Sequence, residues 1–522
     1  TNMQTKPSSN TNISRRHMLG LMSATAAVSM LPWDPLSAQT ATGVLRVRLG
    51  ADIGNLDPAK IFLIENQTVA GHIYNGLVKY DQKTNNIVPD LATSWEISPD
   101  ATVYTFKLRP GVNFHKGFGP LTSDDVKFSY ERVIDPTSGS AYRGQLASIK
   151  SIETPDSLTV RITLTAPTTG LLHKLTAFNQ GWIVSRKAVT EIGDKYSMQP
   201  VGTGPFVFDK WTPGNEARVI ANKAYFDGSP GVNEVIFKVI RDETAAAIAV
   251  ENREIDIFFA LQQPDMIARM RKAKGVVVFE RPANHTINLV LNTTIKPLDD
   301  VRVRRAMSHA INRKALIDGY FKGTKNEAST VLTPSFVEYS DDVMKYPYDP
   351  ARAKALLKEA GLASGFKFVI TAVGLNPFDK IPVPIAEDLK EVGIDTSIQI
   401  LERAAYQQAR SKGELQSCLT GVVGPPDPDS PLITLFSTKS FPPGLNTSRY
   451  DKVDDLLAKA SSTIDPVARK AVYAEILKRT ASDQPLIPLY QDRLFLAHTD
   501  AVQGLVQNSL FTMQSNGVSL KG

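Results

Sequence analysis

Histidine, serine, cysteine and carboxylate side chains could carry chemistry in this chain, but their spacing matches no common catalytic or metal site. The histidines are scattered, and no two stand at the short spacing that zinc ligands require. They are His17, His72, His115, His173, His285, His309 and His498. A Gly-x-Ser-x-Gly turn, typical of serine hydrolases, is not found in the sequence. We therefore expect no catalytic residue, no metal and no cofactor.

Two weaker patterns could indicate enzymatic chemistry. Gly202-Thr203-Gly204-Pro205 begins like a dinucleotide-binding loop, but the third glycine is missing and the proline interrupts it, so a turn is expected. Carboxylates are plentiful, and two of them could act as acid and base on a glycoside, yet the sequence singles out no pair. An exported hydrolase stays open as an alternative. The single cysteine, Cys418, lies in an apolar run and is expected to pack in the core.

The N-terminal segment predicts export from the cytoplasm. Ser14-Arg15-Arg16-His17-Met18-Leu19-Gly20 precedes an uncharged run over residues 21–33, and small residues follow near position 41. This order is typical of a cleaved twin-arginine signal peptide, which we place at residues 1–41. Pro32 and Asp34 end the apolar run before the roughly 20 residues that a membrane-spanning helix needs. The remaining chain is expected in the periplasm.

Size and charge narrow the class of protein further. The chain has 522 residues with 42% hydrophobic content, enough for a large core divided into at least two lobes. Its 59 basic and 53 acidic side chains give a net charge of only +6, without a basic block or an aromatic-basic stripe. A nucleic-acid partner is therefore not expected.

Hydrophobic periodicity predicts strands first and alternating helices and strands later. Residues 44–49, 104–108 and 158–164 alternate as strands do, and a helix is expected over 124–134 after Thr122 and Ser123. A helical stripe runs over 301–320, and Asp349-Pro350 and Asp465-Pro466 each open a helix. With strands between these helices, the second half predicts an α/β lobe with a largely parallel sheet. Residues 276–292 and 485–490 bracket it, which indicates a chain that crosses into a second lobe and returns.

Several short motifs follow one another over nearly the whole chain after residue 41. They are 55–58 (NLDP), 74–78 (YNGLV), 89–95 (PDLATSW), 104–115 (YTFKLRPGVNFH), 121–126 (LTSDDV), 202–206 (GTGPF), 299–306 (DDVRVRRA) and 348–353 (YDPARA). Each motif alone is weak evidence, but in this order and with this spacing they resemble the extracellular solute-binding proteins of the peptide and nickel class, family 5 of the binding proteins of ABC importers.

The resemblance implies a fold, a function and partners. It implies an α/β, two-lobed periplasmic binding protein fold of type II, like the large dipeptide-binding proteins, with an extra subdomain in lobe I. We place lobe I at 43–285 with the subdomain at about 86–200, lobe II at 286–486, and a C-terminal return to lobe I at 487–522. The protein is then a monomer that captures a small molecule by hinge closure and delivers it to ABC permease subunits in the inner membrane.

One loop departs from the pattern of the peptide-binding relatives. In these relatives an aspartate four residues before the proline of an Asp-Pro pair holds the ligand's ammonium, and here that position, counted from Pro428, is Gly424. A buried ammonium without a carboxylate partner would cost several kcal/mol, so ordinary peptide binding is not favoured. An aromatic residue that often begins this loop is replaced by Val422. An opine, an oligosaccharide or a metal chelate would suit the loop better.

The candidate ligand-binding residues follow from this alignment of segments. One cleft wall is assigned to the loop after the first strand, the other to the loop at 421–429, and the floor to the end of the crossing segment. Arg143 is added because nickel-binding relatives place a ligand-contacting arginine near there, and Asp427 because it could replace the missing aspartate. The set is Ile53, Gly54, Asn55, Arg143, Asn284, His285, Val422, Gly424, Pro425 and Asp427.

Two alternative functions stay open. Besides the exported hydrolase, a chaperone or sensor-type subunit with the same fold would bind protein partners without a small solute.

A cluster of three arginines is expected to form a solvated helix face or ion pairs within the protein rather than an anion site. The cluster is Arg302, Arg304 and Arg305.

Overall fold

The computed structural model describes residues 43–521 except Phe62, Ala141, Ala177, Gly424, Pro425 and Phe511. The predicted signal segment at 1–41, and the predicted site residues Gly424 and Pro425, therefore lie outside the described residues. In the part that is described, no helix is both long and apolar enough to cross a membrane.

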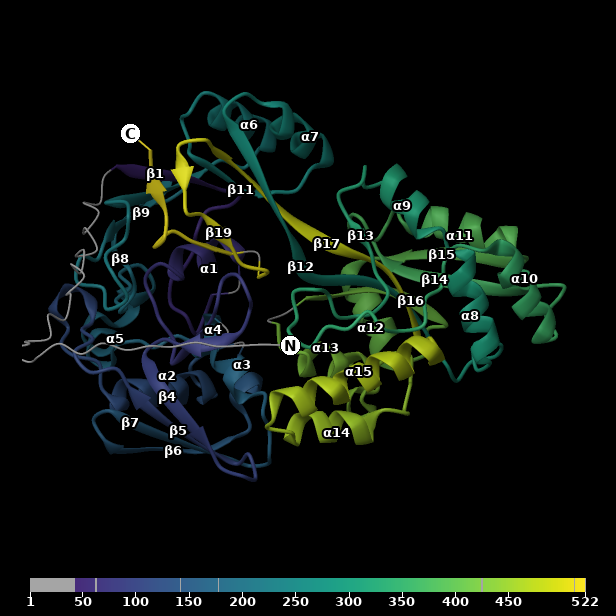
Figure 1. The fold of residues 1–522 in the computed structure, drawn as a ribbon, viewed down its shortest axis with the longest axis horizontal. Helices are drawn as coiled ribbons and strands as arrows, with labels where there is room; N and C mark the ends of the chain where they lie inside the picture. The colour runs from purple at the N-terminus through teal and green to yellow at the C-terminus, as the bar shows by residue number, and fades with distance from the viewer. Residues whose placement is uncertain are drawn as a thin grey trace, which may run out of the picture. The chain divides into compact units, whose positions relative to one another are not determined.

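A mixed sheet forms the backbone of the fold and continues through both lobes (Figure 1). Its strands follow one another in the order β15 (Ile394–Leu401), β14 (Phe366–Val373), β16 (Ser417–Val423), β12 (Val276–Leu291), β17 (Leu486–Thr499), β11 (Ile257–Leu261), β1 (Val44–Leu49), β10 (Glu234–Val239), β9 (Glu216–Ala221) and β8 (Phe206–Thr212). The short strand β13 (Asn326–Glu327) pairs with β17 outside this path.

The expectation of a largely parallel sheet in the second half is only partly correct. Strand β14 is parallel to β15 and to β16, as helix crossovers require. Strand β12, however, is antiparallel to both β16 and β17. The physical reason is that β12 enters the lobe and β17 leaves it, so the two strands must run in opposite directions.

The strands β12 and β17 are long because each belongs to both lobes. Their pairing runs from Val276 opposite Thr499 to Pro282 opposite Arg493, then shifts register and resumes at Thr286 opposite Gln491. An irregularity of this kind bends a strand pair locally. Each of the two strands is therefore continuous along the chain, but the hydrogen-bond ladder between them is interrupted between the lobes.

Separate hydrophobic clusters make the two lobes. The largest joins Leu45 through Phe259 with residues of the C-terminal segment, including Leu496 and Met513. Two other clusters are built from residues 287–490, and a small one joins buried residues between 246 and 270 with Phe495 and Ala497 of β17. A four-stranded antiparallel sheet in the first lobe has the order β4 (Ala92–Ile97), β5 (Val103–Leu108), β7 (Thr159–Leu164) and β6 (Ile149–Asp156).

Helices cover both lobes, and their termini follow the predicted signals. In the first lobe these are α1 (Ile64–Ala70), α2 (Ser123–Ile134), α3 (Leu171–Thr176), α4 (Phe178–Gly181), α5 (Arg186–Ile192), α6 (Glu243–Glu251) and α7 (Pro264–Lys272). In the second they are α8 (Val301–Ala310), α9 (Arg313–Gly319), α10 (Pro350–Glu359), α11 (Pro382–Glu391), α12 (Arg403–Lys412), α13 (Asp429–Phe436), α14 (Asp454–Ser462) and α15 (Pro466–Asp483). Asp349 and Asp465 cap α10 and α15 by accepting from the N–H groups of Arg352 and Ala468.

The helix expected over 301–320 is broken, which corrects that prediction. Ile311 is extended, with φ −83° and ψ 118°, so α8 ends before it. Asn312 then starts α9, because its side chain accepts from the N–H of Ala315 at 2.9 Å. The hydrophobic stripe continues across the break, so periodicity alone does not reveal it.

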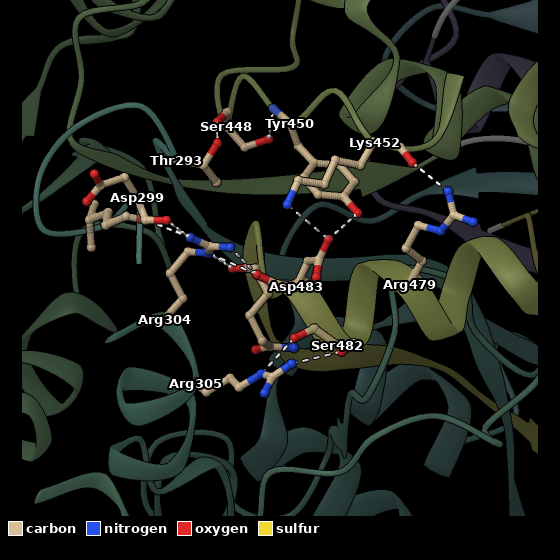
Figure 2. A network of polar contacts seen from close by, with 12 residues as sticks. Thr293, Asp299, Arg304, Arg305, Ser448, Tyr450, Lys452, Arg479, Ser482 and Asp483 are labelled. Atoms are coloured by element: carbon tan, nitrogen blue, oxygen red, sulfur yellow. Dashed lines mark hydrogen bonds and ion pairs between the residues drawn. The ribbon is translucent and has the colours of Figure 1, made fainter. Parts of the chain in front are cut away.

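Arg304 and Arg305 bind the end of α15 through main-chain carbonyl groups, which corrects the expectation of a solvated helix face or ion pairs for these two residues (Figure 2). Arg302 does form an ion pair, with Asp300. Arg304 is buried and donates to the carbonyl oxygens of Asp483 at 2.6 Å and Gln484 at 3.1 Å, and also to that of Leu298 at 2.6 Å. Arg305 donates to the carbonyl oxygen of Ser482 at 2.9 Å. These guanidinium groups satisfy helix-terminal carbonyls and face the negative end of the helix dipole. They also fix the point where β17 begins.

Candidate functional site

A large cleft lies between the two lobes, with the crossing strands as its floor. Its volume is about 1090 Å³, at the upper end of the range for small-molecule sites. The first lobe contributes α1 and the segment that joins β11 to α7, and the second contributes the segment after α9 and the loop at 376–378. Solute held here would contact both lobes at once.

The floor carries a charged group of three side chains, His285, Asp492 and Lys325. Asp492 Oδ2 accepts from His285 Nδ1 at 2.6 Å, and Lys325 Nζ lies 2.8 Å from Asp492 Oδ1. Burial alone would raise the pKa of Asp492, but the hydrogen bond from His285 and the charge of Lys325 outweigh it and lower the pKa to about 2. Asp492 is therefore ionised, so the proton of the His285 bond is on Nδ1.

Gly421 makes room for the ring of His285. A Cβ atom at position 421 would lie 2.5 Å from His285 Nε2 and 2.8 Å from the Cδ1 atom of Ile287. His285 and Gly421 are on neighbouring strands, since His285 pairs with Val423 in the β12–β16 ladder. The carboxylate of Asp492 thus orients the imidazole ring on one side, and on the other side Gly421 leaves the space that the ring occupies.

The wall of the first lobe is held by Arg48 and Glu243. Arg48 is buried on β1 and donates to the carbonyl oxygens of Phe259 at 3.1 Å and Ala260 at 3.4 Å. Burial lowers the pKa of Arg48, and the charge of Glu243 partly offsets this effect. Glu243 Oε2 accepts from the N–H groups of Gln263 at 3.1 Å and Gln262 at 3.4 Å. These bonds fix a segment in which Ala260 has a φ of 54°, inside a bulge of β11.

The wall of the second lobe is aromatic. The rings of Tyr320 and Phe321 have centroids 4.7 Å apart, and those of Phe321 and Tyr490 are 4.6 Å apart. Lys325 Nζ lies 5.5 Å from the centroid of Phe321, within the range of a cation–π contact. Tyr320 donates its hydroxyl to Asn376 Oδ1 at 3.3 Å. The wall therefore combines apolar rings with a few polar groups.

Of the predicted site residues that the structure describes, His285 is the one that lines this cleft. Ile53 is buried in the core of the first lobe, while Gly54 is exposed. Asn55 is half-buried and accepts from the N–H of Asp57 at 2.7 Å. Arg143 is exposed in the turn Arg143–Leu146, next to Tyr142, which does line the cleft.

Asn284 lies beside the floor in a network that joins distant segments. It is buried and accepts from the hydroxyl of Ser335, and its N–H donates to the carbonyl oxygen of Ser509 at 3.3 Å. Asn85 of the first lobe donates to the carbonyl oxygen of Ser335 at 2.6 Å. Val422 is half-buried on β16, opposite Thr286.

Asp427 belongs to a second region of contact between the lobes. It is buried, which raises its pKa, and it accepts from the N–H of Asp429 at 3.1 Å. Asp429 accepts in turn from Tyr473 at 2.6 Å and from Ser461 at 3.1 Å. The N–H of Thr169, from the first lobe, donates to the carbonyl oxygen of Ser461 at 2.8 Å. In this structure Asp427 therefore supports the loop and the lobe contact.

Sequence patterns did not predict Lys325, Asp492 or the segment from Phe259 to Pro264 as part of the site. One signal was available: Gln491-Asp492-Arg493 is a polar triplet inside an otherwise apolar extended run, which is unusual for a buried strand. Among the described residues, no group of three or more histidine, cysteine, aspartate or glutamate side chains is arranged to hold a metal ion.

Comparisons with known proteins agree with this architecture. The model of the family described as bacterial extracellular solute-binding proteins, family 5 Middle, matches residues 86–442. The dipeptide-binding protein of Escherichia coli strain K12 is 31% identical over 478 residues, which are 86% of this chain and 89% of that protein.

Two solved structures align over 92% of this chain and the whole of the other. The structure of HbpA2 from Haemophilus parasuis is 29% identical, with a TM-score of 0.88. The binding protein MoaA of A. tumefaciens R10, in complex with mannopinic acid, is 29% identical, with a TM-score of 0.71.

Proposed function

Because the chain belongs to the bacterial extracellular solute-binding proteins of family 5, we propose that it is the solute-binding component of an ABC importer. It captures a small molecule between its lobes and delivers it to permease subunits in the inner membrane. The observation that carries this proposal is the cleft of about 1090 Å³ whose lining comes from both lobes and from the strands that join them.

The solute is released unaltered. Members of this family bind rather than transform their ligands, and in the described cleft lining His285 and Asp492 are joined to Lys325 rather than to a serine or cysteine nucleophile. No observation favours the hydrolase. Related proteins are named for dipeptides or hold mannopinic acid, so peptides, opines, oligosaccharides and metal chelates are the classes to test.

Closure is a hinge motion of two lobes with the bounds 43–285 and 286–486, and the segment 487–522 returns to the first lobe. The register shift between Pro282 and Thr286, opposite residues 491–493, supports a hinge at this point. Ligand stabilises the closed form because it contacts both walls only when they approach. Gly54, Asn55 and Arg143 of the first lobe and Val422 of the second would complete the walls on closure, whereas buried Ile53 and Asp427 would support their loops.

The protein acts in the periplasm as a monomer. Family 5 binding proteins are periplasmic or extracellular, and the arginine pair before an uncharged run at 21–33 supports export through the twin-arginine pathway, with residues 1–41 removed. Replacing Arg15 and Arg16 by lysine should then leave the precursor in the cytoplasm, as cell fractionation would show.

Native mass spectrometry of the protein from residue 42 onward, purified from cells, tests the central proposal. We expect a retained small molecule, or binding of a member of the four solute classes accompanied by a smaller radius of gyration in X-ray scattering. Conversion of the bound molecule into a product would contradict the proposal, as would a scattering profile that no solute changes.

A further inference from the structure

We propose that a second contact between the lobes acts as an electrostatic latch, which stabilises the closed form at a distance from the solute. The latch consists of Thr169 and Gly170 of the first lobe against the start of α13 and the end of α14, where α3 faces these helices in Figure 1. Its residues lie outside the described lining of the cleft. The inference rests on the proposed hinge motion, but it concerns how closure is held and not which solute binds.

Thr169 and Gly170 make the contact itself. The N–H of Thr169 donates to the carbonyl oxygen of Ser461 at 2.8 Å, and its hydroxyl donates to the same oxygen at 3.2 Å. At Gly170 a Cβ atom would lie 3.5 Å from Asp429 Oδ2 and 3.7 Å from Asp427 Oδ2. The segment before α3 therefore covers two carboxylates of the second lobe directly.

The covered side chains belong to a group of three carboxylates and one guanidinium. The group is Asp427, Asp429, Glu338 and Arg469, and each of these residues is at most 9% exposed. Burial raises the pKa of all three carboxylates, and the charge of Arg469 works against this rise at each of them. Tyr473 joins the two kinds of group, because it donates to Asp429 at 2.6 Å and accepts from Arg469 Nη2 at 3.0 Å. Closure removes water from the carboxylates, so it depends on the charge that Arg469 supplies.

The first lobe brings a charge of its own to this group. Burial raises the pKa of Asp427, whereas the charges of Arg469 and of Lys174, on α3, work against the rise. Burial and then the charge of Arg469 lower the pKa of His173, also on α3, to about 3, so His173 faces the group as a neutral ring. Two cations thus balance three carboxylates across the contact. One more negative charge there would be buried without a cation to pair with, which favours separation of the lobes.

Hydrogen exchange resolved to single residues, on the protein from residue 42 onward, tests the latch without any solute. The bond to Ser461 protects the amide of Thr169 only while the lobes are in contact, so its exchange rate reports the latch. We expect Gly170→Asp, which adds a fourth carboxylate, to speed this exchange by about tenfold or more. Gly170→Ala should change the rate by less than about threefold, because its Cβ atom stays at ordinary contact distance.

Charge is separated from volume by a matched variant. Gly170→Asn has nearly the shape of Gly170→Asp without the charge, and it should speed the exchange of Thr169 far less. Asp427→Asn, added to Gly170→Asp, should bring the rate back toward that of the wild type. Arg469→Met should act as Gly170→Asp does, whereas Arg469→Lys, which keeps the charge, should stay near the wild-type rate. Unchanged exchange in β7 and β14 would show that each lobe remains folded, and if Arg469→Met loosens β14, the Gly170 variants decide.

Two results would overturn the inference. If Gly170→Asn and Gly170→Asp speed the exchange of Thr169 equally, volume rather than charge limits the contact. If neither variant speeds it, the two lobes do not separate at this contact. Both results leave the capture of a solute to its own measurement by native mass spectrometry, so the proposed function can hold although the latch fails.

Discussion

At the scale of single residues, the imidazole ring of His285 fits its position only because Gly421 has no side chain. A Cβ atom there would lie 2.5 Å from Nε2 of His285, closer than packed atoms approach. We expect Gly421→Ala to turn the ring away from Asp492 and to lower the free energy of unfolding by about 1–3 kcal/mol. Chemical denaturation measures this loss. Gly319→Ala is the control, because nothing lies within 4 Å of its added Cβ atom.

The carboxylate of Asp492 makes the stability of the folded protein depend on pH. Its pKa is about 2 in the folded protein instead of 3.8, so the folded state gains about 2 kcal/mol at neutral pH. A carboxylate whose pKa is lower in the folded protein stabilises the folded state at any pH above the pKa of the unfolded chain. This gain is therefore lost as the pH falls from about 4 to about 2. Asp492→Asn should therefore be less stable than the wild type by about 2 kcal/mol at pH 7 and nearly equal to it near pH 2.

Urea denaturation of both proteins at pH 7, 5, 3 and 2 would follow this difference. Asp318→Asn, in an exposed pair with Lys314, should show little effect at any of these values. A difference that stays constant with pH would mean that Asp492 contributes through packing rather than through its charge.

At the scale of elements, Arg304 connects α8, the end of α15 and the start of β17. Its guanidinium bonds four main-chain carbonyl groups, which a lysine ammonium with three hydrogens and no planar fork cannot reproduce. Arg304→Lys should lower the free energy of unfolding by about 2–4 kcal/mol, since buried carbonyls lose charged donors. Arg302→Lys, at an exposed pair with Asp300, should cost far less in the same denaturation experiment.

Local signals predicted most of the elements, and the exceptions have a common cause. The aspartate-proline pairs at 349–350 and 465–466 start α10 and α15 as predicted, because a cap and a first-turn proline act within a few residues. The break between α8 and α9 has the local cap of Asn312, but it also depends on Asp388 of the later helix α11, which accepts from the N–H of Asn312 at 2.8 Å. The direction of β12 in its sheet likewise depends on strands more than a hundred residues away.

At the scale of the whole protein, family motifs predicted the class and the two lobes, while the cleft had to be seen in the structure. His285 and Asp492 are 207 positions apart, and no spacing rule connects them. His285 was predicted because it ends a crossing segment, which is a local feature. Lys325 was not, because its role arises only from the fold that brings β13 beside β17.

The lobes also meet through Asn85, whose effect belongs to the whole protein. Its side chain donates to the carbonyl oxygen of Ser335 in the second lobe at 2.6 Å and accepts from Ser509 of the C-terminal segment at 3.3 Å. Its φ of 59° suits glycine, so Asn85→Gly removes these bonds without backbone strain. Each such bond contributes about 1 kcal/mol.

We expect Asn85→Gly to loosen the contact between the lobes. The radius of gyration without solute should rise in X-ray scattering, and the apparent affinity for a bound solute should fall by up to about tenfold, because the binding-competent form is less populated. Asn86→Gly is the neighbouring exposed control and should alter neither quantity. If Asn85→Gly left both quantities unchanged while lowering the melting temperature, Asn85 would stabilise the first lobe alone, and the orientation of the lobes would depend on β12 and β17.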